Sequence, residues 1–219
     1  MKILRGELNR LRIFARPVVV RRYLKNTPLP KLHLGCGKKI RLGWLNCDKF
    51  ATDADIYLNA YRKLPFQTDT FHCIYMEHLI EHIHTDKIPS FFFELHRVLK
   101  PEGVLRITCP DLELFVRMYY EDNHDFFAPI LERFAARREK NLDKHWLVRT
   151  KGGAFNTRTV YRFYHHRWMY DFETLDWCLR EVGFRDVVRL QFRQSLIDGM
   201  EEMDSESHQM ETLYVDAVK

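Results

Sequence analysis

The chain has 219 residues and a formal net charge of +5; it is long enough to bury one sizeable core, and we expect one folded domain with appendages. No run of about 18 apolar residues occurs, which excludes a membrane-spanning helix, and the opening residues MKILRGELNRLRIF lack the apolar block of a signal peptide. The 5 cysteines are odd in number and fit free thiols in a reducing compartment, so we expect a cytoplasmic protein.

The positive charge is concentrated near the start of the chain. Residues 1–31 carry a net charge of +8, which leaves −3 for the remainder. Apolar residues recur there at helical spacing up to Ala15, and Pro17 suits the first turn of a second short helix. We therefore expect residues 1–30 to form a basic amphipathic arm and linker. This arm either packs on the domain as a helix pair or contacts an anionic membrane surface.

The stretch from Lys31 to Asp48 is the most informative segment of the sequence. It reads KLHLGCGKKIRLGWLNCD, which predicts a short buried strand, a tight turn at Gly35 and Gly37, and a second strand that ends in an acid. The Asp48 carboxylate can accept hydrogen bonds from both hydroxyls of a ribose, so this order indicates a nucleotide pocket. No Lys-Ser/Thr pair follows the glycines to cradle phosphates, which argues against an ATPase.

Alternating strands and helices continue the pattern. We predict strands near residues 31–34, 44–48, 55–58, 71–76 and 103–109, and a helix near residues 88–99. About eight residues separate the first two strands, whereas a crossover helix needs a dozen or more. We therefore expect the first helix to be very short or replaced by a loop.

The end of the chain predicts one helix followed by two antiparallel strands. Asp171 is placed to cap a helix that Gly183 ends, and the segments RDVVRLQF and TLYVDAV then alternate as strands. We expect the acidic run from Glu201 to Glu206, which lies between these strands, to be a solvated loop.

An ordered set of motifs resembles the class I S-adenosylmethionine-dependent methyltransferases, in particular the small type 11 group. The motifs are LHLGCG, GWLNCD, LPF, the pair Glu81-His82 and RVLKPEG, and they cover roughly residues 31 to 111. The resemblance implies an α/β fold with a Rossmann-like, mostly parallel sheet, helices on both faces and a C-terminal antiparallel hairpin. It makes residues 31–219 the methyltransferase domain and S-adenosyl-L-methionine the cofactor. The cofactor-binding residues that it implies are Gly35, Cys36, Gly37, Asp48, Asn59, Met76 and Glu77.

The chain departs from the family pattern at three positions. His33 stands where the family usually has an acid that orients the methionine amino group. Lys39 lies near the position where the family commonly has a third glycine. Asn59 replaces an acid that often contacts the adenine amine, although its side-chain carbonyl can still accept a hydrogen bond from that amine.

Several acids and histidines follow the fourth predicted strand, at the edge that faces the reactive end of the cofactor in this fold. Methyl transfer is an in-line displacement, so the protein mainly positions the acceptor and removes its proton. We predict His82 or His78 as the base and Glu81 as its orienting or cation-binding partner. The alternative is that the Glu-His pair only caps and packs a helix.

Residues 78–82 also match the H-x-x-E-H pattern of inverted zinc peptidases, in which helical spacing places both histidines on one face. The surrounding motifs oppose a peptidase. A divalent cation on Glu77, Glu81 and His82 that assists deprotonation is a milder alternative. Our main expectation includes no metal.

Residues 112–170 form an insertion, which we expect to lie over the carboxyl edge of the sheet as a substrate lid. Its aromatic residues include Tyr119, Tyr120, Trp146, Phe155, Tyr161, Tyr164 and Trp168. His165, His166 and Arg167 precede Trp168 and are candidates for gripping a sugar or phosphate, or are exposed loop polarity. Asp111 either binds substrate hydroxyls or caps the next helix.

We expect a methyltransferase that modifies an oxygen of a hydroxylated small molecule or sugar in glycan or glycolipid biosynthesis. We expect it in the cytoplasm or peripheral to the inner face of the membrane. One alternative is an RNA methyltransferase, but no RNA-binding module and no N-P-P-Y or D-P-P-Y signature occurs, which disfavours nucleic acid. Another is a degenerate scaffold without catalysis, because of His33, Lys39 and Asn59.

Overall fold

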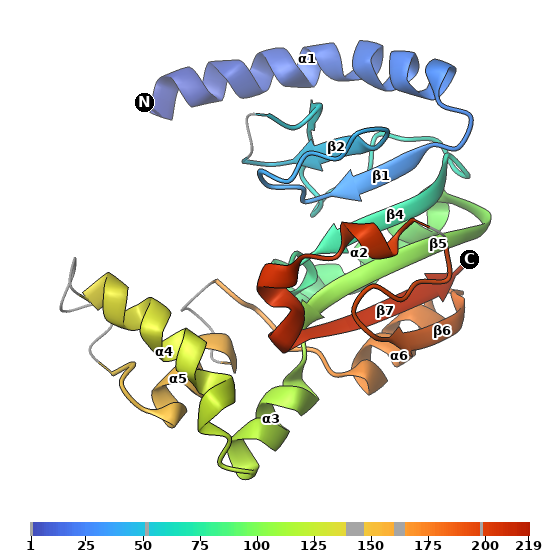
Figure 1. Cartoon of the computed structure of the whole chain (residues 1–219). Coiled ribbons are helices and arrows are strands. Elements are labelled where there is room, and N and C mark those ends of the chain that lie inside the picture. Colours follow the sequence, from blue (N-terminus) through green and yellow to red (C-terminus); the bar gives the residue numbers. More distant parts are fainter. Residues whose placement is uncertain (1, 51–52, 139–146, 160–164, 198) are drawn as a thin grey trace.

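A seven-stranded sheet with the strand order β3-β2-β1-β4-β5-β7-β6 forms the centre of the computed structural model, which describes residues 2–50, 53–138, 147–159, 165–197 and 199–219 (Figure 1). The strands are β1 (Lys31–Leu34), β2 (Leu45–Asp48), β3 (Ile56–Tyr57), β4 (Phe71–Glu77), β5 (Leu99–Pro110), β6 (Arg185–Leu190) and β7 (Thr212–Val218). β7 runs antiparallel to both of its neighbours, and the other pairs are parallel. The predicted mostly parallel sheet with a C-terminal antiparallel pair is therefore confirmed.

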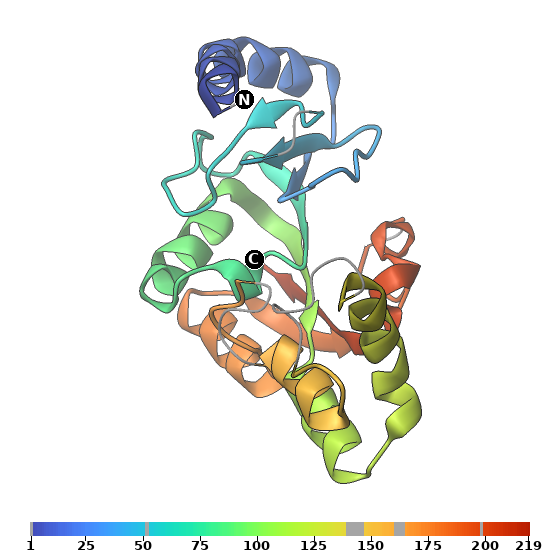
Figure 2. The same cartoon turned by 90° about the vertical axis from the view of Figure 1, so that its left-hand side faces the viewer.

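Within the described residues, six α-helices accompany the sheet: α1 (Lys2–Asn26), α2 (Ile88–Val98), α3 (Leu112–Tyr120), α4 (His124–Arg138), α5 (Lys151–Thr159) and α6 (Phe172–Glu181). α2 and α6 cover one face of the sheet, and their buried Phe92, Leu95 and Leu175 join the main apolar core (Figure 2). As predicted, Asp171 caps α6, accepting a hydrogen bond of 2.8 Å from the Thr174 N–H. The predicted helices at these positions are thus confirmed.

The opposite face of the sheet is covered by the connection between β6 and β7. Residues 35–44 form only turns, so no crossover helix follows β1, as the short spacing predicted. Met200 and Met203 pack instead against Trp44 and Tyr75 on this face. The connection contains the short 3-10 helices η3 (Glu201–Met203) and η4 (Glu206–Glu211). The expectation of a solvated loop holds for the exposed Glu202 and Glu206, but it is wrong for Met203 and Asp204, which are 4% and 6% exposed.

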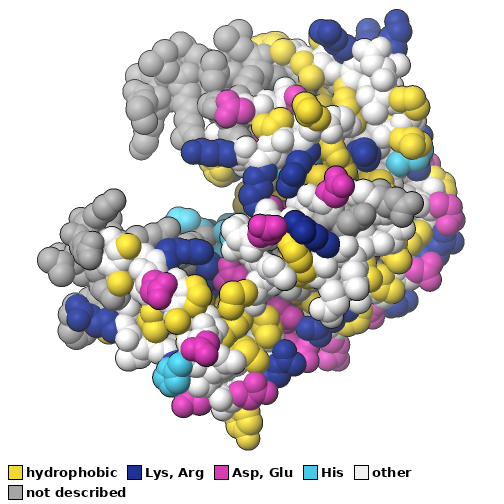
Figure 3. Space-filling view, viewed as in Figure 1, with side chains coloured by type: hydrophobic (Ala, Val, Ile, Leu, Met, Phe, Trp, Pro, Cys, Tyr) yellow, Lys and Arg dark blue, Asp and Glu magenta, His cyan; other side chains and the backbone are white. Residues whose placement is uncertain are grey.

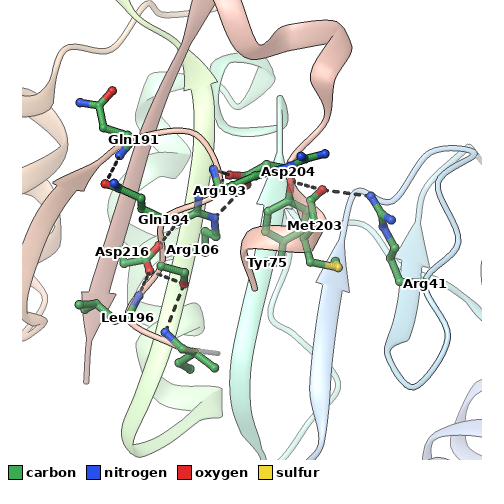
Figure 4. A network of polar contacts seen from close by, with 12 residues as sticks. Arg41, Tyr75, Arg106, Gln191, Arg193, Gln194, Leu196, Met203, Asp204 and Asp216 are labelled. Atoms are coloured by element: carbon green, nitrogen blue, oxygen red, sulfur yellow. Dashed lines mark hydrogen bonds and ion pairs between the residues drawn. The ribbon is translucent and has the colours of Figure 1, made fainter. Parts of the chain in front are cut away.

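A buried ion-pair network holds this connection, which we call the β6–β7 segment (residues 191–211), on the sheet (Figure 4). Arg106 of β5 is fully buried and lies 2.6 Å from an Asp204 carboxylate oxygen and 2.7 Å from one of Asp216. The backbone N–H of Arg193 donates to the Asp204 carboxylate at 2.8 Å. The Met203 carbonyl accepts from Tyr75 Oη at 3.1 Å. One guanidinium thus joins β5, β7 and the segment.

The basic N-terminal arm is one continuous helix, so the expected pair of helices was wrong. Pro17 lies inside α1, where it removes a single hydrogen bond without ending the helix. The turns after it pack Val20 and Leu24 against the core. The Tyr23 hydroxyl lies 2.9 Å from the Lys31 carbonyl. No helix in the described part of the chain is long and apolar enough to cross a membrane.

The insertion after β5 forms a lobe of α3, α4 and α5 beyond the carboxyl end of the sheet (Figure 1). It has its own apolar cluster, which includes Phe115, Phe127 and Ala154. Trp146, Tyr161 and Tyr164 lie outside the described residues. The lobe is therefore a packed unit, and its role as a lid stays a prediction.

Candidate functional site

The order of the strands places a crevice at the carboxyl ends of β1 and β4. The strand order reverses between these two strands, and ligands of open α/β sheets bind outside such a switch point. Figure 3 shows the molecule hollowed there, between the part that carries α1 and the helical lobe. Lysine and arginine side chains gather at the margin of this hollow, and histidines lie at its lower edge.

The glycine turn and Asp48 form one end of the crevice. Gly35 and Gly37 have φ values of +72° and +55°, which only glycine adopts without strain. The Asp48 Oδ2 accepts a hydrogen bond of 3.0 Å from the Gly37 N–H, and Oδ1 accepts from the Phe50 N–H. A Cβ at Gly37 would have no atom within 4 Å, so the turn faces open space that a ligand can enter. These features fit the ribose end of a nucleoside cofactor.

His33 belongs to the core rather than to the crevice. It is 1% exposed, and its Nδ1 lies 3.2 Å from the side-chain oxygen of Asn46. Burial lowers the pKa of His33 to about 4, so the ring is neutral near pH 7. His33 therefore cannot replace the charge of the acid that the family pattern has at this position.

Lys39 and Glu77 supply opposite charges at the carboxyl ends of β1 and β4. Lys39 Nζ lies 2.7 Å from Glu77 Oε2 and also contacts the Ser205 hydroxyl. Burial acts to raise the pKa of Glu77, but Lys39 and Ser205 outweigh it, and the pKa lies below its usual value. The Glu77 carboxylate and the Lys39 ammonium together complement the ammonium and carboxylate of an amino acid.

The other three predicted cofactor residues serve mainly the local structure. Met76 is fully buried in the core, so its side chain packs and does not line the crevice. The Cys36 N–H donates to the Cys47 carbonyl at 3.1 Å. Asn59 Oδ1 accepts from the Tyr61 N–H at 3.1 Å, which leaves its second lone pair for an adenine amine. Their roles toward the cofactor stay predictions.

The predicted catalytic residues converge on the buried carboxylate of Glu81. Its Oε1 lies 3.3 Å from His78 Nδ1 and 3.9 Å from His82 Nε2. The α-helical spacing that the zinc-peptidase alternative requires is not formed: His78 has a φ of +48°, a 3-10 turn η1 (Ile80–His82) follows, and α2 begins at Ile88. Burial acts to raise the pKa of Glu81, but His78, His82 and His166 outweigh it and the pKa is lowered.

The glycine turn and the loop of residues 78–82 are in contact. A Cβ built on Gly35 would lie 3.0 Å from the Leu79 side chain, so Leu79 rests against the turn. His78 and Glu81 therefore lie next to the cofactor crevice. His82 is the more accessible histidine, with 32% of its side chain exposed against 15% for His78.

The insertion contributes His166 and Arg167 to the same place. The Arg167 N–H donates to the Glu81 carbonyl at 2.5 Å, and the rings of His82 and His166 lie 5.0 Å apart. His166 is 5% exposed, which contradicts the alternative of exposed loop polarity for this residue. Burial lowers the pKa of His166, so the ring is neutral near pH 7. His165 is exposed, and its role toward an acceptor stays a prediction.

Asp111 has the capping role that was one of its two expected roles. Its Oδ1 accepts from the Leu114 N–H at 3.2 Å at the start of α3, and its Oδ2 lies 2.7 Å from Arg189. Asp111 thus caps α3 and pairs with Arg189, and its role toward a substrate stays a prediction.

Sequence reasoning missed the contribution of the β6–β7 segment to this site. The ring centroids of His208 and His78 lie 4.2 Å apart, and a carboxylate oxygen of Glu211 lies 2.9 Å from the guanidinium of Arg158 in α5. The Thr212 hydroxyl lies 3.0 Å from His78 Nε2. A signal existed: β7 is antiparallel to β5, so its first residues lie at the edge where the parallel strands end.

Comparisons with known proteins identify the family and the fold of the chain. Residues 19–189 match the family model described as a methyltransferase domain, and because this is well over half of the chain, the protein belongs to that family. Comparison with curated proteins found no match. A SAM-dependent methyltransferase structure from Archaeoglobus fulgidus is 15% identical, with a TM-score of 0.50 over 97% of this chain and 94% of that chain. One from Mesorhizobium loti is 15% identical, with a TM-score of 0.47 over 94% of this chain and 97% of that chain.

The similarity to the Archaeoglobus structure shows the fold, and the family match shows the class. The Rossmann-like fold and the resemblance to class I methyltransferases that the motifs predicted are both confirmed. The protein is a methyltransferase of this class, and its cofactor is S-adenosyl-L-methionine.

Proposed function

We propose that the protein methylates an oxygen of a hydroxylated small molecule or sugar, as a step in glycan or glycolipid biosynthesis. The observation that carries this proposal is the group of His78, Glu81 and His82 beside the glycine turn. A hydroxyl must lose its proton during methyl transfer, whereas a neutral amine already offers a lone pair. A site built around histidines and a carboxylate therefore favours an oxygen acceptor.

Each residue of the crevice has a distinct task in this reaction. Gly35, Gly37 and Asp48 hold the nucleoside, and Lys39 with Glu77 holds the charged amino-acid end. The cofactor supplies an activated methyl group. The acceptor oxygen forms a bond to the methyl carbon, the carbon–sulfur bond breaks with its electrons staying on sulfur, and the acceptor proton passes to His82. Glu81 fixes the orientation of the histidines and stabilises the imidazolium.

The surroundings of the cluster support a polar acceptor. A cavity of about 90 Å³ lies between α4 and the β6–β7 segment, lined in part by Arg133, Arg158 and His208. Trp168 is 50% exposed next to Arg167. Arginine side chains and an exposed indole suit a polar, hydroxylated acceptor. We include His165 as a second contact to the acceptor at the exposed edge.

Two alternatives have distinct signatures. An RNA acceptor would be supported by a salt-sensitive mobility shift with RNA, because phosphate contacts release counterions. A non-catalytic scaffold would be supported by the absence of cofactor binding in calorimetry.

Replacing Asp48 with alanine is expected to weaken cofactor binding by about 2–3 kcal/mol, because charge-assisted hydrogen bonds to the ribose are lost. Calorimetric titration with S-adenosyl-L-methionine measures this loss. Asp48→Asn keeps the shape and is expected to lose less. Asp69→Ala is the control, since Asp69 pairs with Lys219 away from the crevice. Unchanged affinity in Asp48→Ala would remove our assignment of the ribose site.

We also propose that α1 contacts an anionic membrane surface from the cytoplasm. Phe14 and Val18 are 81% and 71% exposed, and Arg21 and Arg22 are exposed on the same helix. Arg21→Gln with Arg22→Gln is expected to weaken binding by about 2 kcal/mol, since each basic residue near the surface contributes about 1 kcal/mol. Co-sedimentation with phosphatidylserine vesicles at low and high salt measures this. Arg180→Gln with Arg185→Gln is the matched control, and equal losses in both pairs would contradict a specific contact.

A further inference from the structure

We propose that Glu81, His82 and His166 bind a divalent transition-metal ion, and that this ion binds the hydroxyl of the acceptor. The candidate ligand atoms of these three residues lie within 4.8 Å of one another. Tetrahedral coordination at about 2.0–2.2 Å places ligands roughly 3.3–3.6 Å apart, so side-chain shifts on the order of an ångström close the site. The catalytic role of the ion rests on the proposed function, whereas the binding of the ion does not.

The carboxylate of Glu81 is the strongest reason for a cation. Glu81 is 0% exposed, and within the described part of the chain neither of its oxygens has a hydrogen-bond partner. His78 approaches at 3.3 Å without the alignment of a hydrogen bond. A buried carboxylate without hydrogen bonds is costly unless a cation compensates its charge. A metal ion at this point supplies both the charge and the bonds.

His166 has the arrangement typical of a metal ligand. Its Nδ1 lies 3.0 Å from the Arg158 carbonyl oxygen, which can only accept, so Nδ1 carries the proton. The lone pair of the neutral ring is therefore on Nε2. Metal-bound histidines commonly donate their other N–H to a carbonyl in this way, which fixes the tautomer and the ring orientation. The packed insertion thus presents one preoriented ligand atom.

The contacts of His78 also indicate a cation near Glu81. The Thr212 hydroxyl donates its one proton to the His208 carbonyl at 2.6 Å, so it accepts from His78 Nε2 at 3.0 Å. Nδ1 of His78 lies 3.3 Å from Glu81 Oε1 without forming a hydrogen bond. A metal ion on Glu81 supplies the bonds that this contact does not supply.

The set of ligands selects the class of metal. Two imidazoles and one carboxylate suit zinc, iron or manganese, whereas magnesium prefers oxygen ligands alone. Three protein ligands leave a coordination position for a hydroxyl. Coordination lowers the pKa of that hydroxyl, so its proton passes to water and the oxygen keeps the electron pair that attacks the methyl carbon. His82 is then a ligand rather than the base. Glu77 is excluded from the set because it pairs with Lys39.

Calorimetric titration of the EDTA-treated full-length protein with Zn²⁺, Mn²⁺ and Mg²⁺ tests the site, with mass spectrometry of bound metal for the stoichiometry. We expect one Zn²⁺ or Mn²⁺ per chain and Mg²⁺ binding at least about 10-fold weaker. His166→Ala and His82→Ala are each expected to lower the affinity by about 100-fold or more. His84→Ala is the matched control, because His84 is exposed and outside the ligand set.

The outcomes separate the metal site from the proposed function. Absence of one-to-one binding, or binding unchanged in His166→Ala, overturns the site. Glu81→Gln is informative only if it folds, so the histidine variants, checked by thermal melting, carry the test. Asp48→Ala is expected to keep the metal while losing S-adenosyl-L-methionine. Metal binding without any cofactor binding in the native chain would retain the site and contradict the proposed O-methylation.

Discussion

Replacing His82 with alanine is expected to lower the catalytic rate constant by about 100-fold to 10,000-fold, with cofactor affinity close to that of the native protein. The reason is that His82 is the accessible histidine of the cluster, and acceptor deprotonation depends on it either as base or as metal ligand. Initial rates of S-adenosylhomocysteine release measure the effect, with an acceptor found by screening hydroxylated sugars. Calorimetry with S-adenosyl-L-methionine confirms that binding persists.

His78→Ala is the internal comparison for this variant. Both ring nitrogens of His78 face protein groups, Nδ1 toward Glu81 and Nε2 toward Thr212, so its loss is expected to be smaller. A loss confined to His78 would move the base to that residue. Equal and modest losses in both variants would indicate packing roles only. Inhibition by EDTA that Zn²⁺ or Mn²⁺ reverses would assign His82 to the metal, and turnover insensitive to chelation would leave it as the base.

The parts of the fold that local rules determine could be predicted from the sequence. The strand before Gly35, the strand that ends in Asp48, and α6 with its Asp171 cap each depend on apolar periodicity and on residues within a few positions. The absence of a crossover helix after β1 followed from chain length alone. Asp48 lies against Gly37 in the structure, because the two parallel strands end at one edge.

The parts that depend on contacts distant in sequence could not be predicted. The acidic run before β7 has the composition of a solvated loop, yet Arg106 holds Asp204 in the interior across the sheet. Pro17 has the pattern of a helix start, but packing of the following turns keeps α1 continuous. His166 became part of the cluster only because the insertion folds back on Glu81. No local pattern encodes such pairings.

The covering of the open face explains why the β6–β7 segment matters for the site. A crossover helix after β1 would shield this face of the sheet. In its place, the segment packs Met200 and Met203 on Trp44 and Tyr75. It also supplies the Ser205 hydroxyl to Lys39 and the His208 ring to His78. A change that loosens the segment should therefore reduce both stability and cofactor binding.

Replacing Arg106 with methionine is the stability variant with the largest expected effect. It leaves the carboxylates of Asp204 and Asp216 buried without their cation, and breaking such a buried pair costs about 3–5 kcal/mol. For a protein of this size that corresponds to a melting temperature lower by roughly 6–20 °C. Differential scanning calorimetry measures the shift. Cofactor affinity is expected to fall with it, because the segment carries Ser205.

Arg193→Ala in the same segment is the matched control for Arg106→Met. The Arg193 side chain pairs with Glu206 at 2.9 Å, but these side chains are 55% and 76% exposed. Exposed ion pairs contribute about 0–1 kcal/mol, so this variant should melt close to the native protein. Adding Asp204→Asn and Asp216→Asn to Arg106→Met removes the unpaired charges and should recover part of the loss. If Arg106→Met melts like Arg193→Ala, the buried network does not hold the segment on the sheet, and apolar packing of Met200 and Met203 alone must do so.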